Sequence, residues 1–130
     1  LRLYGCLFLT YFGHKNQIEQ DMIEIKKIIL KLFDKALVNP RLRQNYDFHI
    51  SSDDGSQRML SIFMPGTDIP IHRHPMSNEN VLLICGKFIG VLFDDNGNEV
   101  ERIHFDPSAG NFGGGAVGVW HTVEVFEPFV

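Results

Sequence analysis

The sequence predicts one mainly β domain, a sandwich or closed barrel, preceded by a single α-helix. Its 130 residues suffice for one hydrophobic core and are too few for two ordinary domains. One helical pattern occurs near the N-terminus, and every later segment is short, strand-like and bounded by turn residues. About seven short strands at such regular spacing are typical of sandwiches and barrels.

The helix is expected from Asp21 to about Leu37. Asp21 and Glu24 form a capping-box-like start, apolar residues then recur at helical spacing, and lysines occupy the opposite face. Asn39-Pro40 stops the pattern. We therefore assign residues 21–40 to the helix and 41–130 to the β-barrel.

Residues 1–20 form an N-terminal extension with two interpretations. Its apolar stretch of about a dozen residues is too short to cross a bilayer of ~30 Å, and no signal-peptide cleavage site follows it. In one interpretation, the natural protein starts at Met22 and residues 1–20 are encoded upstream of that start. In the other, they form an added strand that pairs with a sheet edge. We expect no membrane partner.

Turn residues divide the rest of the chain into strands, which we expect at 46–51, 57–64, 80–85, 87–93, 99–105 and 117–126. The turn at 94–98 contains Asn-Gly, a strong hairpin signal. The stretch 110–115 is rich in glycine and carries no strand prediction.

Composition limits the partners and the compartment. A net charge of −4 without a basic stripe argues against nucleic acid. Cys6 and Cys85 lie far apart and form no CxxC pair, which favours a reducing compartment, the cytoplasm. Cys85 stands in an apolar run, and we interpret it as a small buried hydrophobe.

Chemistry-bearing residues gather in the segment 66–86. His72 and His74 are two residues apart, so an extended strand presents both imidazoles on one face. Glu79 follows a proline-containing turn, and His121 can join from a neighbouring strand. This nitrogen and oxygen set suits a divalent Fe, Mn, Ni, Co, Cu or Zn ion with open coordination positions. The plainer alternatives are an exposed histidine pair and a hydrogen-bonded core histidine.

The spacing of this segment matches the first cupin motif, G(X)5HXH(X)4E(X)6G, at Gly66, His72, His74, Glu79 and Gly86. A chance match somewhere in the chain is on the order of one in 10⁴. The second motif, G(X)5PXG(X)2H(X)3N, falls on Gly110, Gly118 and His121, with Ala116 in place of proline and Val125 in place of asparagine. The sequence thus resembles the cupins, whose fold is a double-stranded β-helix or jelly-roll barrel.

From about Met22 to Val130 the chain is more similar still to the small WbuC-type cupin-fold metalloproteins. The similarity rests on NPRLRQNYDFH, QRML before the PGT turn, HRH, GVLFDDNG and WHTVEV. It implies one divalent ion (Zn, Fe, Ni or Mn) held by the three histidines and Glu79, and a loose link to O-antigen and other surface-polysaccharide genes. Family habit and exposed strand edges predict a homodimer. That group normally continues into a further strand, which this chain lacks.

Two functions follow from this resemblance. One is a metal-dependent isomerase, epimerase or oxygenase acting on a small, polar, sugar-like molecule in the barrel mouth. The alternative is a non-catalytic module that binds a metal or small molecule, and a weaker third is a scaffold without metal.

The catalytic candidates are Arg58, which pairs with an anionic substrate or reaches solvent, and His49 near the pocket mouth. Apolar neighbours of His121 leave few groups for acid–base chemistry.

Overall fold

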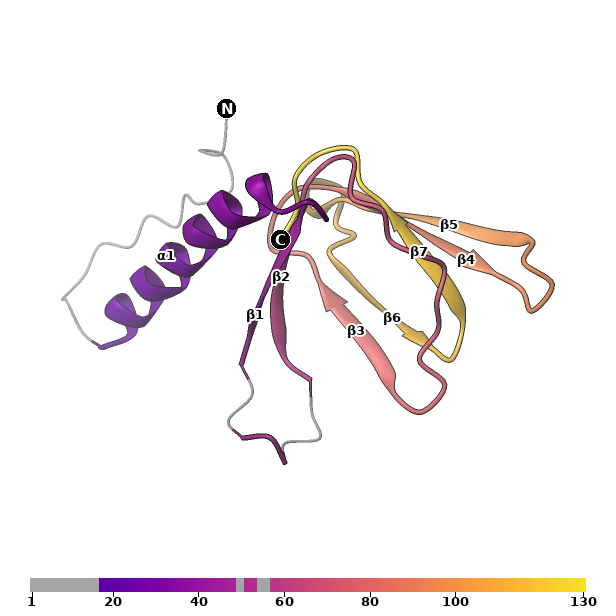
Figure 1. Cartoon of the computed structure of the whole chain (residues 1–130), viewed down its shortest axis with the longest axis horizontal. Coiled ribbons are helices and arrows are strands. Elements are labelled where there is room, and N and C mark those ends of the chain that lie inside the picture. The colour runs from indigo at the N-terminus through magenta and orange to yellow at the C-terminus, as the bar shows by residue number, and fades with distance from the viewer. Residues whose placement is uncertain (1–16, 49–50, 54–56) are drawn as a thin grey trace.

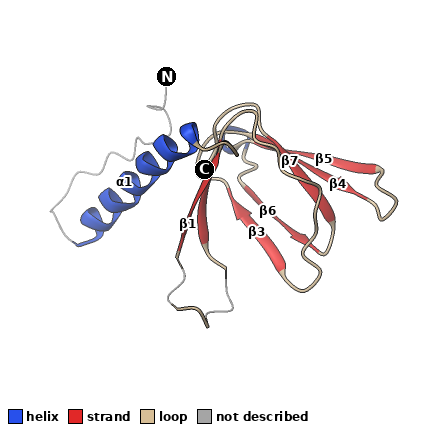
Figure 2. Cartoon of the chain, viewed as in Figure 1, coloured by secondary structure: helices blue, strands red, loops and turns tan. Residues whose placement is uncertain are grey.

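The computed structural model describes residues 17–48, 51–53 and 57–130, which form one α-helix and antiparallel strands (Figures 1 and 2). In chain order the elements are α1 (Gln17–Val38), β1 (Arg43–Asp47), β2 (Met59–Phe63), β3 (Asn78–Leu82), β4 (Phe88–Phe93), β5 (Glu99–Phe105), a 3₁₀-helix (Pro107–Ala109), β6 (Gly113–Val117) and β7 (Trp120–Glu124). The prediction of a mainly β domain with one preceding helix is confirmed. The helix in this part of the chain is not one that could cross a membrane.

The strands form three antiparallel ladders: β1 with β2, β3 with β6, and β5–β4–β7. In the described residues these ladders fan apart and do not close into a continuous barrel (Figure 1). The last two residues bring two ladders together, because Phe129 bridges Phe63 of β2 and Val130 exchanges backbone hydrogen bonds with Cys85 after β3. A further bridge between His72 and His121 lies on the edge of β7 that β4 leaves free.

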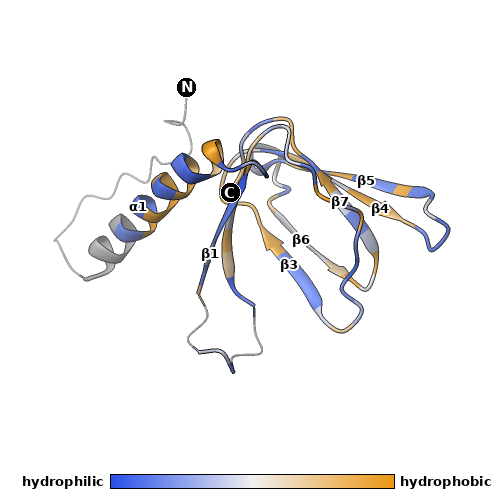
Figure 3. Cartoon of the chain, in the orientation of Figure 1, coloured by the Kyte–Doolittle hydropathy of each residue, from blue (hydrophilic) through white to orange (hydrophobic). Residues whose placement is uncertain are grey.

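Helix α1 covers one side of β2. Its buried residues recur at spacings of three and four, so they line one stripe that packs on Leu60 and Ile62 (Figure 3); they are Ile29, Leu32, Phe33 and Ala36. Cys85 is buried in the same cluster, as predicted. The described helix starts at Gln17, so Asp21 lies inside it and the predicted start at Asp21 is wrong. Gln and Glu before Asp21 have good helix propensity, which permits the extra turn.

A second core of aromatic rings lies on the other side of the strands. Phe88 stacks on Phe105 and on Phe129, with ring centroids 4.4 and 4.6 Å apart, and Phe129 stacks on Phe63 at 4.8 Å. Buried Leu83 and half-buried residues of β5 and β7 complete this cluster. Phe63, Phe88 and Phe105 thus pack in a core that also includes Val123 of β7, the strand that carries His121.

One strand prediction is wrong, and one strand was not predicted. The first strand is Arg43–Asp47, earlier than 46–51, and β6 begins within the glycine-rich stretch. Glycine disfavours strands in general, but here β6 approaches β3 closely. A Cβ on Gly115 would lie 2.8 Å from the Asn80 side-chain oxygen, and one on Gly113 would lie 3.0 Å from the Val81 carbonyl oxygen. Close approach explains the glycines.

The hairpin predicted at 94–98 is confirmed. The Asp94 carboxylate accepts hydrogen bonds from the backbone N–H groups of Asn96 and Asn98, and Gly97 has a φ of 82°. A hydrogen bond from the Asn98 side chain to Asp94 Oδ2 lowers the pKa of Asp94, and the backbone contacts lower it further. At the end of β5, Asp106 caps the 3₁₀-helix, and hydrogen bonds from Ser108 and Lys87 lower its pKa to about 2.

Replacing Gly86 by alanine should destabilise the protein strongly. Gly86 has a φ of 86°, and a Cβ there would lie 2.2 Å from the Pro128 carbonyl oxygen. The left-handed backbone conformation is strained for alanine, and its Cβ would overlap the Pro128 carbonyl oxygen. Together these effects should reduce the free energy of unfolding, measured by urea denaturation, by about 3 kcal/mol or more. Gly97→Ala is the matched control, because its φ is 82° but nothing lies within 4 Å of the new Cβ; about 1 kcal/mol is expected there. Equal losses would contradict the steric explanation.

Candidate metal centre

Three histidines meet where the segment before β3 runs beside β7. The backbone N–H of His72 donates to the His121 carbonyl oxygen at 3.0 Å, and the His121 N–H donates to the His72 carbonyl oxygen at 2.8 Å. Residues paired in this way in an antiparallel ladder point to the same face. The two rings are accordingly 4.5 Å apart, and the His74 ring is 5.7 Å from that of His121.

Glu79 brings a carboxylate to the histidines from β3. Its Oε2 atom lies 2.9 Å from His121 Nε2 and 3.6 Å from His74 Nε2. The pairing of β3 with β6 places Glu79 opposite Ala116, the residue that departs from proline in the second motif. One ligand atom from each of the four predicted residues lies within 4.8 Å of all the others. The predicted group is therefore assembled in full.

These separations fit a single divalent ion. With metal–ligand distances of roughly 2.0–2.2 Å, neighbouring ligand atoms lie about 3 Å apart at right angles and about 3.4 Å apart in a tetrahedron. The distances from Glu79 to His121 and His74 fall in or near this range. The site thus has the size and the donor set of a mixed nitrogen and oxygen metal centre.

Backbone carbonyl groups orient two of the imidazoles. Nδ1 of His72 lies 2.8 Å from the Pro70 carbonyl oxygen, and Nδ1 of His121 lies 2.8 Å from that of Val119. A carbonyl oxygen only accepts hydrogen bonds, so Nδ1 carries the hydrogen in both rings. In the neutral imidazole this leaves the lone pair on Nε2, the atom directed toward Glu79 or the shared centre.

Two features of the site are those that a bound cation would satisfy. His74 Nε2 is buried and has no hydrogen-bond partner among the described residues. His121 Nε2 faces the Glu79 carboxylate at 2.9 Å, and two lone pairs at that distance repel unless a proton or a metal ion lies between them. A divalent ion would satisfy both atoms at once.

The centre is closed on one side and open on the other. The His121 side chain is only 9% exposed, whereas those of His74 and Glu79 are 37% and 39% exposed. Solvent therefore reaches the carboxylate side, where an ion with more than four coordination positions would accept a further ligand.

The motif glycines have backbone conformations that favour glycine. All four have φ between 63° and 88°: Gly66, Gly86, Gly110 and Gly118. Gly118 lies in the turn between β6 and β7, two residues before Trp120 and three before His121. Val125, which departs from asparagine, packs against the aromatic core. The departure thus replaces a polar group by a packing residue and leaves the four ligands intact.

Of the two catalytic candidates, the structure describes only Arg58, which does not belong to this group. Arg58 is exposed and lies just before β2, where its carbonyl oxygen accepts a hydrogen bond from the Phe48 N–H. This agrees with the interpretation of Arg58 as a surface residue. His49 lies outside the described residues. His104 is exposed on β5.

Sequence reasoning missed Glu101. His121 is paired with Leu92 of β4, and Leu92 is paired with Glu101 of β5, so all three share one face of the sheet. Among the described residues on this face of β4, β5 and β7, His121 and Glu101 are the polar ones. The signal that could have identified Glu101 is the hairpin register, but the bulge after Leu92 conceals it in the sequence.

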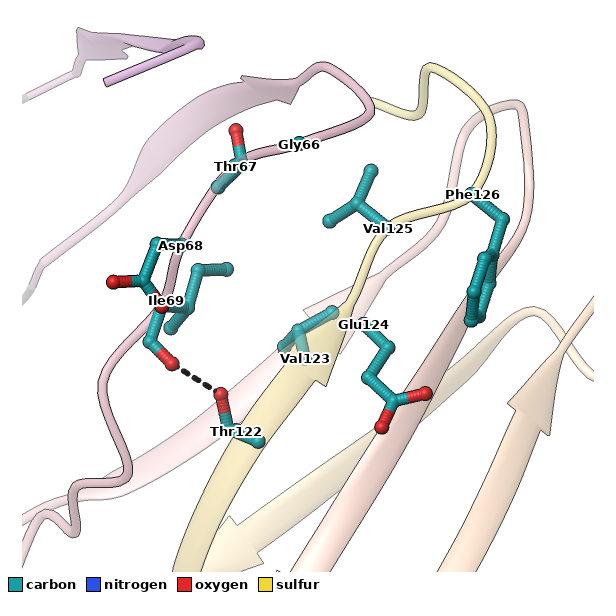
Figure 4. Close-up of a pocket in the computed structure, with 9 residues that line it drawn as sticks. All are labelled: Gly66, Thr67, Asp68, Ile69, Thr122, Val123, Glu124, Val125 and Phe126. Carbon is teal, nitrogen blue, oxygen red and sulfur yellow. Dashed lines mark hydrogen bonds between the residues drawn. The ribbon is translucent and has the colours of Figure 1, made fainter. Parts of the chain in front are cut away.

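A separate open cavity of about 420 Å³ lies beside the end of β7 (Figure 4). Thr122 donates a hydrogen bond across it to the Ile69 carbonyl oxygen. None of the four predicted ligands lines it; its lining is Gly66, Thr67, Asp68, Ile69, Thr122, Val123, Glu124, Val125 and Phe126. The histidine centre is therefore distinct from this cavity.

His121→Ala should abolish tight binding of Zn²⁺ or Mn²⁺, because it removes the buried ligand opposite Glu79. We expect a loss larger than the ~10–100-fold that follows substitution of an outer-shell partner, measured by isothermal titration calorimetry. His104→Ala is the matched control, since it also removes an imidazole but from an exposed position. Equal affinities for the two variants would contradict the assignment.

Comparison with known proteins places the chain in a family. A family described as "Domain of unknown function (DUF6016)" matches residues 25–105, more than half of the chain. The matched region includes His72, His74 and Glu79 and ends before His121. No curated protein and no solved structure matched the chain. The chain belongs to the DUF6016 family.

Proposed function

We propose that the protein is a cupin-type metalloprotein that binds one divalent metal ion and, on its open side, a small polar molecule. The observation that carries this proposal is the convergence of four ligand atoms within 4.8 Å, from residues at the spacing of the first cupin motif and from His121. The match to a family of unknown function neither adds to this proposal nor opposes it.

The order of the strands supports the cupin fold. Hydrogen-bonded neighbours form two series of segments. In space, one series has the order β1, β2, Phe129–Val130, β3, β6. The other has the order His72, β7, β4, β5. The aromatic core joins the two series through Phe129 and Phe88. Two antiparallel series around a shared core are what a jelly-roll barrel requires.

The donor set favours Zn, Fe, Ni or Mn. Three imidazoles and one carboxylate bind all of these ions, and among the described residues no cysteine belongs to this group, so nothing in it favours Cu(I) or a structural zinc site. When bound, such an ion supplies a Lewis acid that polarises an oxygen atom of the molecule beside it.

A second candidate function is a metal-dependent isomerase, epimerase or oxygenase acting on a sugar-like molecule. It is favoured by Glu101, whose backbone lies two strand spacings, or about 10 Å, from that of His121 on the same face. A molecule held between them would meet a carboxylate able to take up or return a proton. Without such a role for Glu101, the centre is a non-catalytic binding module.

Metal content tests the principal proposal. Protein expressed without a histidine tag should carry close to one divalent ion per chain by elemental analysis, or should take up one on titration after dialysis. The tag must be absent because it binds the same ions. Protein that is purified without metal and takes up none would refute the proposal.

Turnover separates the enzyme from the module. We expect metal-loaded protein to convert at least one member of a panel of sugar nucleotides, sugars and keto acids if it is an enzyme, and Glu101→Gln should then lower kcat by about 10²-fold or more. The matched control Glu99→Gln, on the same strand, should leave kcat unchanged. A panel without turnover, combined with thermal stabilisation by one compound, would identify a binding module instead.

A further inference from the structure

Behind the histidines lies a second cluster of side chains, formed by Arg73, Trp120 and Asp95. The Arg73 guanidinium lies 4.6 Å from the centroid of the Trp120 ring. Asp95 Oδ1 accepts a hydrogen bond from Trp120 Nε1 at 3.1 Å and one from Arg73 Nη1 at 3.3 Å. A single carboxylate oxygen therefore holds both partners of a cation–π pair.

This Arg73–Trp120–Asp95 cluster shares its backbone with the metal centre. Arg73 stands between His72 and His74, and Trp120 immediately precedes His121. Side chains alternate between the two faces of an extended strand, so the cluster lies on the face opposite the imidazoles. It braces the same strand pair that the two backbone hydrogen bonds between His72 and His121 join.

Asp95 comes from a different part of the chain, the turn between β4 and β5. That turn is fixed by the hydrogen bonds that Asp94 accepts from Asn96 and Asn98. Pairing of Phe93 with Trp120 sets the turn beside the start of β7. The carboxylate thus joins the two histidine-bearing segments to the β4–β5 hairpin.

We infer that Asp95 is a positioning residue of the metal centre: by holding Arg73 and Trp120 it fixes the spacing between His72, His74 and His121. This inference rests on the proposed metal binding. Asp95 is 85% exposed, so water and salt screen its charge. What remains is the geometry of its acceptor oxygen, which asparagine also provides.

The test compares the metal affinity of the tag-free full chain with that of Asp95→Ala and Asp95→Asn, using Zn²⁺ in isothermal titration calorimetry. Asp95→Ala should weaken binding about 10-fold, within the range that outer-shell partners show. Asp95→Asn should bind as the unaltered chain does. Glu99→Ala is the matched control, since Glu99 belongs to the same hairpin but pairs with Arg102.

Trp120 is the only tryptophan of the chain and reports on the same cluster. Co²⁺ should quench its fluorescence with a midpoint equal to the calorimetric affinity for Co²⁺. The urea midpoint of metal-free Asp95→Ala should shift no more than that of Glu99→Ala, which separates positioning from general destabilisation.

Three results would overturn the inference: unchanged affinity in Asp95→Ala, an equal loss in Glu99→Ala, or a loss in Asp95→Asn as large as that in Asp95→Ala. Failure of the proposed function is distinguishable, because the unaltered chain would then bind no Zn²⁺ at all.

Discussion

The pair of backbone hydrogen bonds between His72 and His121 is the contact on which the candidate site depends. It joins two segments that are distant in the sequence and turns both side chains to one face. His74 lies on the same face as His72 because side chains alternate along an extended segment. Strand β3 places the Glu79 carboxylate beside His121. If this pairing slipped by one residue, the imidazoles would face opposite sides and the Arg73–Trp120–Asp95 cluster would separate with them.

The second constraint is electrostatic. A carboxylate 2.9 Å from an imidazole nitrogen requires a proton or a metal ion between the two atoms, and a second nitrogen, His74 Nε2, is buried nearby without a hydrogen-bond partner among the described residues. The surroundings enforce this arrangement: the Pro70 and Val119 carbonyl groups fix two rings, and the aromatic core holds the strands behind them. A divalent ion shared by these residues would stabilise the arrangement, which is why we propose a metal centre here.

The ligands were predictable from the sequence because their spacing reflects local strand geometry and a motif. The hairpin at 94–98 was predictable for the same reason, since Asn-Gly determines it locally. β6 could not be predicted from the sequence. Its glycines are required by the close approach of β3, which is a tertiary contact that no local sequence pattern shows. Asp95 and Glu101 were also missed, since their positions depend on how β4 and β5 pair and on the bulge after Leu92.

The most direct measurement is anomalous diffraction from crystals of the tag-free protein grown with Zn²⁺ or Mn²⁺. We expect one strong anomalous peak, about 2.0–2.3 Å from Nε2 of His72, His74 and His121 and from a carboxylate oxygen of Glu79. A protein that crystallises in this fold with no peak among these four residues, or with its metal bound elsewhere, would contradict the assignment of a metal centre.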